Sequence, residues 1–406
     1  MRGRLLEIKA ADEYASSVSL SELPLSYCTN VHPGRSVAEI EAGLDRYTVP
    51  IRERFGHPLA AGLWLAKPVI DELLSSRDSA DRFARGLADR GLTCHTLNAF
   101  PYGDFHDARV KEKVYLPDWT TDQRFLYTMG CAKILAVLLG DKSEGSISTL
   151  PLGFKGFKQS PDFVDAVIGI MMDVALGLRR LHEQTGKLIR LAIEPEPLCI
   201  LETTGEAIGF FEKLWQVSKI AKVEEAVRTH IGLCYDVCHQ SVEFEDVAQS
   251  IRDLDAAGVR INKVHLSCAI QLDNPADNPE GRTALRRYIE PRYLHQTIAR
   301  GMDGRIVRET DLNEALIQKP GEGFAGAPAW RIHFHVPIDA NRLGPLATTR
   351  PDLKNALGAV AKLPYAPHLE VETYTWEVLP DAGPGDLIEG LARELVSARE
   401  MIDKVG

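Results

Sequence analysis

The sequence predicts a closed α/β barrel of eight parallel strands, each followed by a helix. Short apolar runs alternate with amphipathic helical patterns along the chain, which is typical of right-handed strand-helix-strand units that build a parallel sheet. Eight such units fit a (β/α)8 barrel, or TIM barrel, better than an open sheet. No GxGxxG or GxxxxGK[ST] run supports a nucleotide-binding sheet. We therefore expect residues 1–406 to form a single barrel domain.

Eight segments are predicted as barrel strands, because each is short, apolar and bounded by turn residues. They are residues 24–30, 60–66, 92–99, 147–153, 189–196, 231–237, 262–268 and 368–374. Helical patterns lie between them, for example at 36–55 and 160–184. The second of these opens on Ser160-Pro161, a cap followed by proline in the first turn.

A stretch rich in proline, glycine and charge interrupts this alternation after the seventh strand. We interpret residues 270–329 as an insertion carrying one or two helices, at 281–301 and 310–318. A ninth strand pattern, 330–338, follows it. This pattern either belongs to the insertion or is a barrel strand that replaces one of the eight.

Composition narrows the classes of partner. The chain has 45% hydrophobic residues and a formal net charge of -10, which argues against a nucleic-acid partner and against an anionic membrane. Its longest apolar run, at 131–140, is too short to span a bilayer, and residues 1–17 lack the apolar core of a signal peptide. Seven scattered cysteines suit buried thiols in a reducing cytoplasm. The sequence leaves open whether the chain forms a homo-oligomer.

Potential metal ligands stand at the ends of the last four predicted barrel strands, where chemistry sits in this fold. They are Glu194 and Glu196, Asp236 with His239, His265, and the pair Glu370 and Glu372. Because side chains alternate along a strand, these groups face the barrel interior together. Ionised carboxylates buried side by side are costly unless a cation compensates them. The pattern therefore predicts a site for a divalent ion such as Mn²⁺, Mg²⁺, Co²⁺ or Zn²⁺.

The choice of ligands within this set stays open. Either glutamate of each pair could bind, and the imidazole could come from His265 or from His333 or His335 in the segment RIHFHV.

A polar loop after the third strand is expected to bind substrate. The segment HTLNAFPYGDFH carries His95, Asn98, Tyr102 and His106, and its amide and phenol groups suit the hydroxyls of a sugar-like small molecule. A turn at Pro101-Tyr102-Gly103 without a functional role is the alternative.

Two resemblances follow from these motifs. Glu-Pro after strand five, YDVCHQ, KVHLS and the last glutamate resemble the xylose-isomerase-like TIM barrel superfamily of sugar isomerases and epimerases. That resemblance implies Glu194, Asp236, His265 and Glu372 as metal ligands, with His239 beside the metal. This sequence departs from the pattern in its extra inward acids Glu196 and Glu370, and in the insertion and the HFH strand. The predicted substrate contacts therefore also include His239, Glu196, Glu370 and His335.

Longer strings resemble the metabolite traffic protein EboE family, which belongs to the same superfamily. They are TLNAFPYGDFH, VKEKVYLPDW, YLHQT, RIHFHVPI and HLEVETYTWEVLP. The resemblance implies a place in a secondary-metabolite pathway.

The function expected from the sequence is a metal-dependent isomerase or epimerase acting on a sugar, sugar phosphate or cyclitol. Glu194 and Glu372 would exchange protons with the substrate from opposite sides. A non-catalytic metabolite-binding protein and a metal-dependent hydrolase or endonuclease are the alternatives.

Overall fold

The structure is a computed structural model that describes residues 20, 23–380, 382–383 and 385–405. The segment 1–17, for which the sequence predicts no signal peptide, lies outside the described residues. Within the described ranges, no helix combines the length and the apolar character that crossing a bilayer requires. All seven cysteines are buried and form no disulfide.

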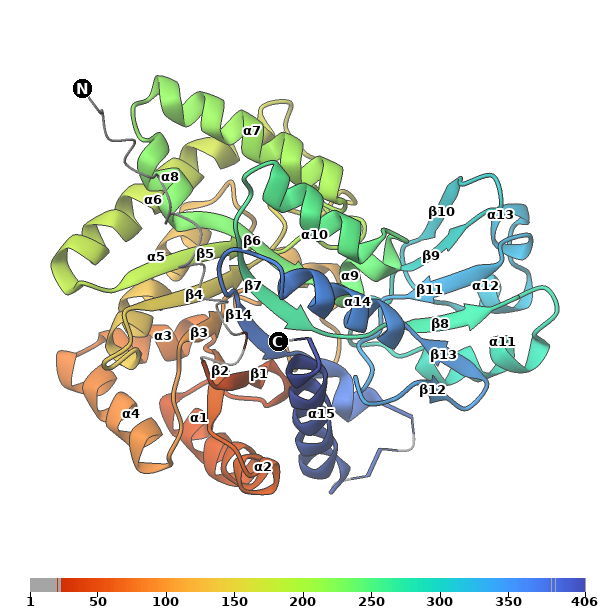
Figure 1. Ribbon diagram of the computed structural model, residues 1–406, viewed down its shortest axis with the longest axis horizontal. Coiled ribbons are helices and arrows are strands. Elements are labelled where there is room, and N and C mark those ends of the chain that lie inside the picture. Colours follow the sequence, from red (N-terminus) through yellow and green to blue (C-terminus); the bar gives the residue numbers. More distant parts are fainter. Residues whose placement is uncertain (1–19, 21–22, 381, 384, 406) are drawn as a thin grey trace, which may run out of the picture.

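A closed barrel of eight parallel strands forms the centre of the molecule, as predicted (Figure 1). The strands follow one another in the order β1-β14-β7-β6-β5-β4-β3-β2, which closes the ring because β1 pairs with both β14 and β2. They are β1 (Leu25–Cys28), β2 (Leu59–Trp64), β3 (Thr96–Asn98), β4 (Glu144–Thr149), β5 (Leu188–Ile193), β6 (Ile231–Asp236), β7 (Ile261–Leu266) and β14 (His368–Val371).

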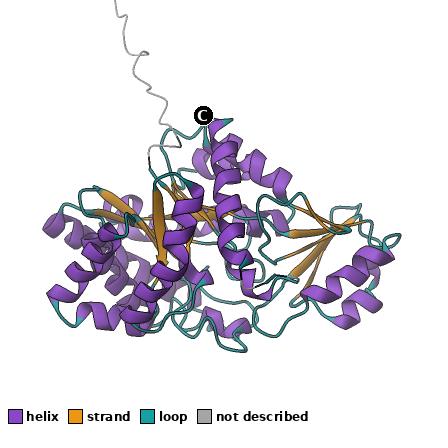
Figure 2. Cartoon of the chain, turned by 90° about the horizontal axis from the view of Figure 1, so that it is seen from below, coloured by secondary structure: helices purple, strands orange, loops and turns teal. Residues whose placement is uncertain are grey.

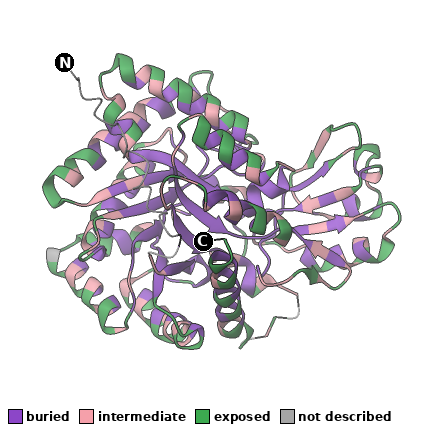
Figure 3. Ribbon diagram, viewed as in Figure 1, coloured by how far each residue is buried: buried purple, intermediate pink, exposed green. Residues whose placement is uncertain are grey.

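Helices surround the barrel and bury their apolar faces against it, so the strands are buried and the outer helix faces are exposed (Figure 3). They are α1 (Val37–Gly43), α2 (Val49–Phe55), α3 (Lys67–Leu74), α4 (Arg77–Asp89), α5 (Asp122–Leu138), α6 (Phe163–Thr185), α7 (Thr204–Ile220), α8 (Glu224–His230), α9 (Val237–Val242), α10 (Val247–Ala256), α14 (Arg350–Val360) and α15 (Asp386–Asp403).

Two helix predictions need correction. The pattern at 36–55 forms α1 and α2 with a π-helical turn between them at Leu44–Thr48. Helix α6 begins at Phe163 rather than at Ser160-Pro161, and its N-cap residue Asp162 makes no side-chain capping bond.

A second, antiparallel sheet stands beside the barrel and accounts for the ninth strand pattern (Figure 2). Its order is β10-β9-β11-β8-β13-β12. The strands are β8 (Ile270–Asp273), β9 (Thr297–Arg300), β10 (Ile306–Glu309), β11 (Ala329–Ile332), β12 (Arg342–Leu343) and β13 (Leu346–Thr348), and short helices α11 (Pro279–Leu285), α12 (Glu314–Gln318) and α13 (Glu322–Ala325) accompany them.

The second sheet decides between the two interpretations of residues 330–338, and it corrects the helix predicted at 281–301. The pattern at 330–338 contributes β11, which pairs with β8 and β9 and not with a barrel strand. Residues 281–301 were predicted as a helix, but only their first part is helical, and β9 lies near their end. The sheet includes strands on both sides of residue 329, so the predicted insertion 270–329 covers part of it.

Candidate metal and substrate site

Four side chains from consecutive barrel strands meet at the C-terminal end of the barrel. Glu194 follows β5, Asp236 ends β6, His265 lies near the end of β7, and Glu372 follows β14. One potential ligand atom of each lies within 4.8 Å of the others, and all four side chains are buried. Strand pairing places Asp236 directly opposite His265 on the neighbouring strand. The structure therefore brings together the four residues that the superfamily pattern implies.

Within this cluster, His265 points one ring nitrogen at all three carboxylates. Its Nδ1 lies 2.8 Å from Glu372 Oε2, 3.1 Å from Glu194 Oε1 and 3.5 Å from Asp236 Oδ2. Burial alone would lower the pKa of His265, but its anionic neighbours, Glu372 and Glu194 among them, raise it well above its ordinary value. In the absence of a cation, a protonated imidazole thus carries the compensating charge.

The carboxylates differ in how their oxygens are engaged. Glu372 Oε1 accepts hydrogen bonds from the amides of Asn30 and Asn98, at 2.9 and 3.0 Å. Asp236 Oδ1 accepts from the Ser267 hydroxyl at 2.7 Å. Glu194 Oε2 and Asp236 Oδ2 have no hydrogen-bond partner among the described residues. Buried oxygens without a partner are costly, so these two are suited to a cation.

Burial and neighbouring charge separate the pKa values of these acids. Burial raises the pKa of Glu194 to about 7, although His265 opposes the shift. Burial would also raise the pKa of Asp236 and of Glu372, but nearby imidazoles, His239 for Asp236 and His265 for Glu372, hold both below their ordinary values. Two carboxylates are therefore anionic at neutral pH, and one can gain or lose a proton there.

The structure distinguishes the members of each glutamate pair. Glu370 lies one step deeper in the barrel, where its Oε1 is 2.6 Å from Lys263 Nζ and 3.5 Å from His265 Nε2. Lys263 and the Ser26 hydroxyl fix this carboxylate beneath the cluster. Burial alone would raise the pKa of Glu370, but Lys263 lowers it to about 2. Gly62 leaves room for it, because a Cβ there would lie 1.4 Å from Glu370 Oε2.

Glu196 lies further out, at the mouth of the barrel. Its Oε1 accepts hydrogen bonds from Tyr115 Oη at 2.6 Å and from Gln296 Nε2 at 3.2 Å. Burial raises the pKa of Glu196 to about 8, so it carries a proton at neutral pH. Tyr115 and Gln296 were not predicted as site residues. Gln296 comes immediately before β9, in a segment that the sequence predicts as helix.

A small cavity of about 60 Å³ opens above the cluster. Glu194, Glu196, Glu372, Asn98 and His239 contribute polar groups to it. Asn30, Lys111 and His333 also contribute polar groups, and the rest of the wall is aromatic and aliphatic: Phe100, Pro101, Phe105, Val110, Val114, Tyr115, Tyr293, Leu294 and Tyr374. The site thus combines a carboxylate floor with a largely apolar wall.

Several predicted substrate contacts lie outside the cavity wall. His95 packs edge-on against His368 in the barrel interior, below the cavity. Tyr102 packs against Tyr127, and His106 packs against Trp64. Glu370 is occupied by Lys263. None of these four predicted contacts is part of the cavity wall. His335 also lies outside that wall, and it donates through Nδ1 to the Glu372 backbone carbonyl at 2.8 Å.

Fold and site together define a class: a (β/α)8-barrel protein with a buried cluster of one histidine and three carboxylates at the C-terminal ends of its strands. No family model matches the chain, and no curated protein matches it. Solved structures do match. A xylose isomerase-like TIM barrel protein from Mycobacterium smegmatis in complex with magnesium is 12% identical, with 95% of this chain and 99% of that chain covered and a TM-score of 0.48.

Two further solved structures have lower scores. The IolI protein with a bound zinc atom is 14% identical over 95% of this chain and 99% of its own, with a TM-score of 0.45. The 3-keto-D-glucoside 4-epimerase of E. coli is 14% identical over 60% of this chain and 78% of its own, with a TM-score of 0.36. At these identities and scores the likeness is one of fold, and the chemistry rests on the residues of this chain.

Proposed function

We propose that this protein is a metal-dependent isomerase or epimerase of a small hydroxy-carbonyl compound such as a sugar or a cyclitol ketone. The observation that carries the proposal is the convergence of His265 with Glu194, Asp236 and Glu372, all buried and within 4.8 Å of one another. One imidazole with carboxylates is a ligand set that suits Mn²⁺, Mg²⁺, Co²⁺ or Zn²⁺. When bound, such a cation polarises a substrate carbonyl and stabilises the charge that develops as the adjacent C–H loses its proton.

The other residues of the site orient the carboxylates and transfer protons. Asn30 and Asn98 hold Glu372 in one orientation through its Oε1, so Oε2 is presented to the cluster. Glu194 has one oxygen beside His265 and another without a hydrogen-bond partner, so one carboxylate oxygen can hold the cation while the other accepts a proton from substrate carbon. Glu372 faces Glu194 across the cluster, and in an epimerisation it would first take up a proton from solvent and then deliver it to the opposite face of the carbon, while Glu194 releases the proton that it accepted.

The cavity wall favours a neutral substrate over a phosphate ester. Apart from histidines, Lys111 is the one cationic residue that contributes to the described wall. Its ammonium group already binds the backbone carbonyls of Glu290 and Tyr293 and the carboxylate of Asp311, at 3.0, 2.6 and 2.6 Å. A phosphate would therefore meet carboxylates and aromatic rings without a free positive charge. The same wall disfavours a nucleic-acid backbone.

The motif resemblance to the metabolite traffic protein EboE family supports a role for this activity in a secondary-metabolite pathway. The apolar rings of the wall agree with a substrate that carries a hydrophobic face, since such rings pack on the C–H face of a sugar or cyclitol.

A proton-exchange experiment tests the proposal. The full-length protein, loaded with Mn²⁺, Co²⁺ or Zn²⁺, is incubated in D₂O with a panel of neutral ketoses and inosose-type ketones, and deuterium at the carbon beside the carbonyl is followed by NMR. We expect exchange in the wild type and its loss in Glu194→Gln and in Glu372→Gln, with the fold retained by circular dichroism.

The controls separate the alternatives. Glu225, exposed on α8 and outside the cluster, gives a matched Glu225→Gln variant that should exchange at the wild-type rate. Ligand binding without deuterium incorporation would support a non-catalytic metabolite-binding protein instead. Full exchange activity in Glu194→Gln would contradict the role of that residue.

A further inference from the structure

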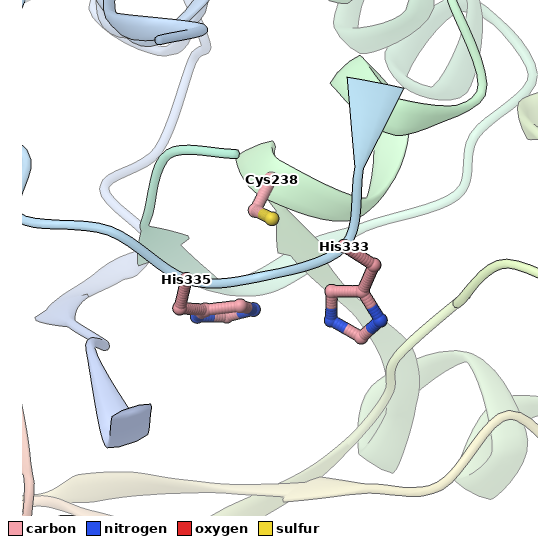
Figure 4. Close-up of side chains that lie close together, drawn as sticks. All are labelled: Cys238, His333 and His335. Atoms are coloured by element: carbon pink, nitrogen blue, oxygen red, sulfur yellow. The ribbon is translucent and has the colours of Figure 1, made fainter. Parts of the chain in front are cut away.

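Three histidines form a second cluster next to the first. His239 lies in α9, one helical turn after Asp236, and His333 and His335 lie just after β11 of the second sheet. The ring centroids of His239 and His333 are 4.6 Å apart, those of His239 and His335 5.5 Å, and those of His333 and His335 5.3 Å. All three side chains are buried. Figure 4 shows His333 and His335 side by side, with Cys238 close to both.

Each of the three rings is anchored through the same nitrogen. The Nδ1 of His239 lies 2.9 Å from the Pro195 carbonyl, that of His333 2.7 Å from the Gln296 side-chain oxygen, and that of His335 2.8 Å from the Glu372 carbonyl. A carbonyl oxygen can only accept, so each Nδ1 carries the hydrogen. Every neutral ring therefore presents Nε2 as an unprotonated lone pair.

The Gln296 side-chain amide presents its oxygen, and not its nitrogen, to His333. Its Nε2 donates to Glu196 Oε1 and to the Pro197 carbonyl, both at 3.2 Å, so the oxygen is the atom that faces His333. The Nε2 atoms of His333 and His335 have no hydrogen-bond partner among the described residues. Buried lone pairs without a donor are unfavourable, and metal ligation is one way to satisfy them.

Asp236 lies beside both the histidine cluster and the four-residue cluster. Potential ligand atoms of Asp236, His239 and His335 lie within 4.8 Å of one another, and so do those of Glu196, His239 and His333. Asp236 is also a member of the four-residue cluster. Its Oδ2 has no hydrogen-bond partner among the described residues. Asp236 is thus placed to contact two cations, one on each side.

We propose that His239, His335 and Asp236 bind a second divalent cation, with His333 packed against both rings, and that Asp236 bridges it to the cation of the four-residue cluster. Neutral imidazoles dominate this second set, whereas carboxylates dominate the first. Imidazole-rich sites suit Zn²⁺, and oxygen-rich sites suit Mn²⁺ or Mg²⁺. The second site is therefore a zinc site, and the protein has a dinuclear centre that can hold two neighbouring oxygens of a substrate.

This proposal does not depend on the proposed reaction. It requires only that His239, His335 and Asp236 bind zinc, so it is tested by metal stoichiometry and position rather than by turnover. The second site joins the barrel to the second sheet, because Asp236 and His239 come from the barrel and His335 from the segment after β11.

Elemental analysis of the full chain tests the proposal. Wild-type protein is saturated with Zn²⁺, dialysed and assayed for bound metal. We expect two zinc ions per chain in the wild type, one in the double variant His333→Gln/His335→Gln, and two in His57→Gln, a control at an exposed histidine. One zinc ion per chain in both the wild type and the double variant would overturn the second site and leave the first intact.

A crystallographic measurement on the wild type covers the case in which the double variant fails to fold. Crystals soaked in Zn²⁺ are measured at the zinc absorption edge. We expect one anomalous peak about 2.0–2.1 Å from the Nε2 atoms of His239 and His335 and another within the four-residue cluster. A peak in the cluster alone would overturn the second site, and a peak at the histidines alone would overturn the first site and leave the second standing.

Discussion

At the scale of single residues, Lys263 and Glu370 decide which glutamate joins the metal cluster. Both are fully buried, and they form an ion pair of 2.6 Å directly beneath His265. Although burial opposes its ionisation, Lys263 holds Glu370 as an anion, and this carboxylate faces the second nitrogen of the His265 ring. Such a carboxylate orients a histidine ligand and strengthens its basicity.

We predict that Lys263→Met destabilises the protein by roughly 3–5 kcal/mol, because it leaves the Glu370 charge buried without a partner. The double variant Lys263→Met/Glu370→Met should recover most of this loss, since it removes both charges. Urea denaturation of the metal-free proteins measures both effects. Equal stability of the single and double variants would contradict the ion-pair interpretation.

The sequence indicated which strand ends carry candidate ligands but could not choose among the candidates on one strand. Period two places Glu370 and Glu372 on one side of β14, so alternation alone could not separate them. The difference comes from depth along the strand and from Lys263 on the adjacent strand, which is a contact between distant parts of the chain. The same holds for His95, whose direction follows from its contact with His368.

At the scale of elements, the buried side chain of Glu394 connects α15 to the segment that follows β14. Glu394 accepts hydrogen bonds from the Thr373 hydroxyl at 2.7 Å, the Trp376 indole at 2.9 Å and the Ile338 amide at 3.0 Å. Burial raises the pKa of Glu394 to about 7. Helix α15, the segment after β14 and the segment after β11 thus converge on this side chain.

A pH dependence follows from this shift. The folded protein binds the Glu394 proton more tightly than the unfolded chain, whose glutamates titrate near 4.5. The contribution to stability is therefore complete below pH 4.5 and is lost as the pH rises toward about 7, in total on the order of 3 kcal/mol. We expect Glu394→Gln to flatten this part of the stability curve, as measured by urea denaturation between pH 4.5 and 8. A curve parallel to that of the wild type would contradict it.

The barrel strands were predictable within a few residues because their apolar runs are bounded by turns, but the second sheet was not. Its strands have two to four residues each, too few for alternation to be read against the surrounding loops. Strand β4 begins three residues before the predicted segment, because its inward side carries Ser146 and Ser148 rather than apolar residues. In β9 the contacts made with β10 and β11 override the local helical pattern.

At the scale of the whole molecule, the second cluster is a junction between the barrel and the second sheet. If zinc binds there, it couples the two parts. At a free concentration one hundred times its dissociation constant, a ligand that binds only the folded state adds about 2.7 kcal/mol to the free energy of unfolding.

We therefore expect zinc to slow amide hydrogen exchange in β11 and in the residues that follow it, as followed by mass spectrometry. In His333→Gln/His335→Gln the added metal should protect the barrel cluster but not this segment. Equal protection of β11 in both proteins would show that the junction does not depend on the metal.

The small volume of the cavity restricts how a substrate can enter the site. About 60 Å³ holds a few waters, whereas pockets that enclose drug-sized ligands measure roughly 300–1,000 Å³. The Lys111 ammonium binds the 290–293 segment and Asp311 across one side of this space. We expect a sugar-sized ring to reach the carboxylates only when the 290–293 segment moves, so that this movement rather than diffusion limits the rate of association.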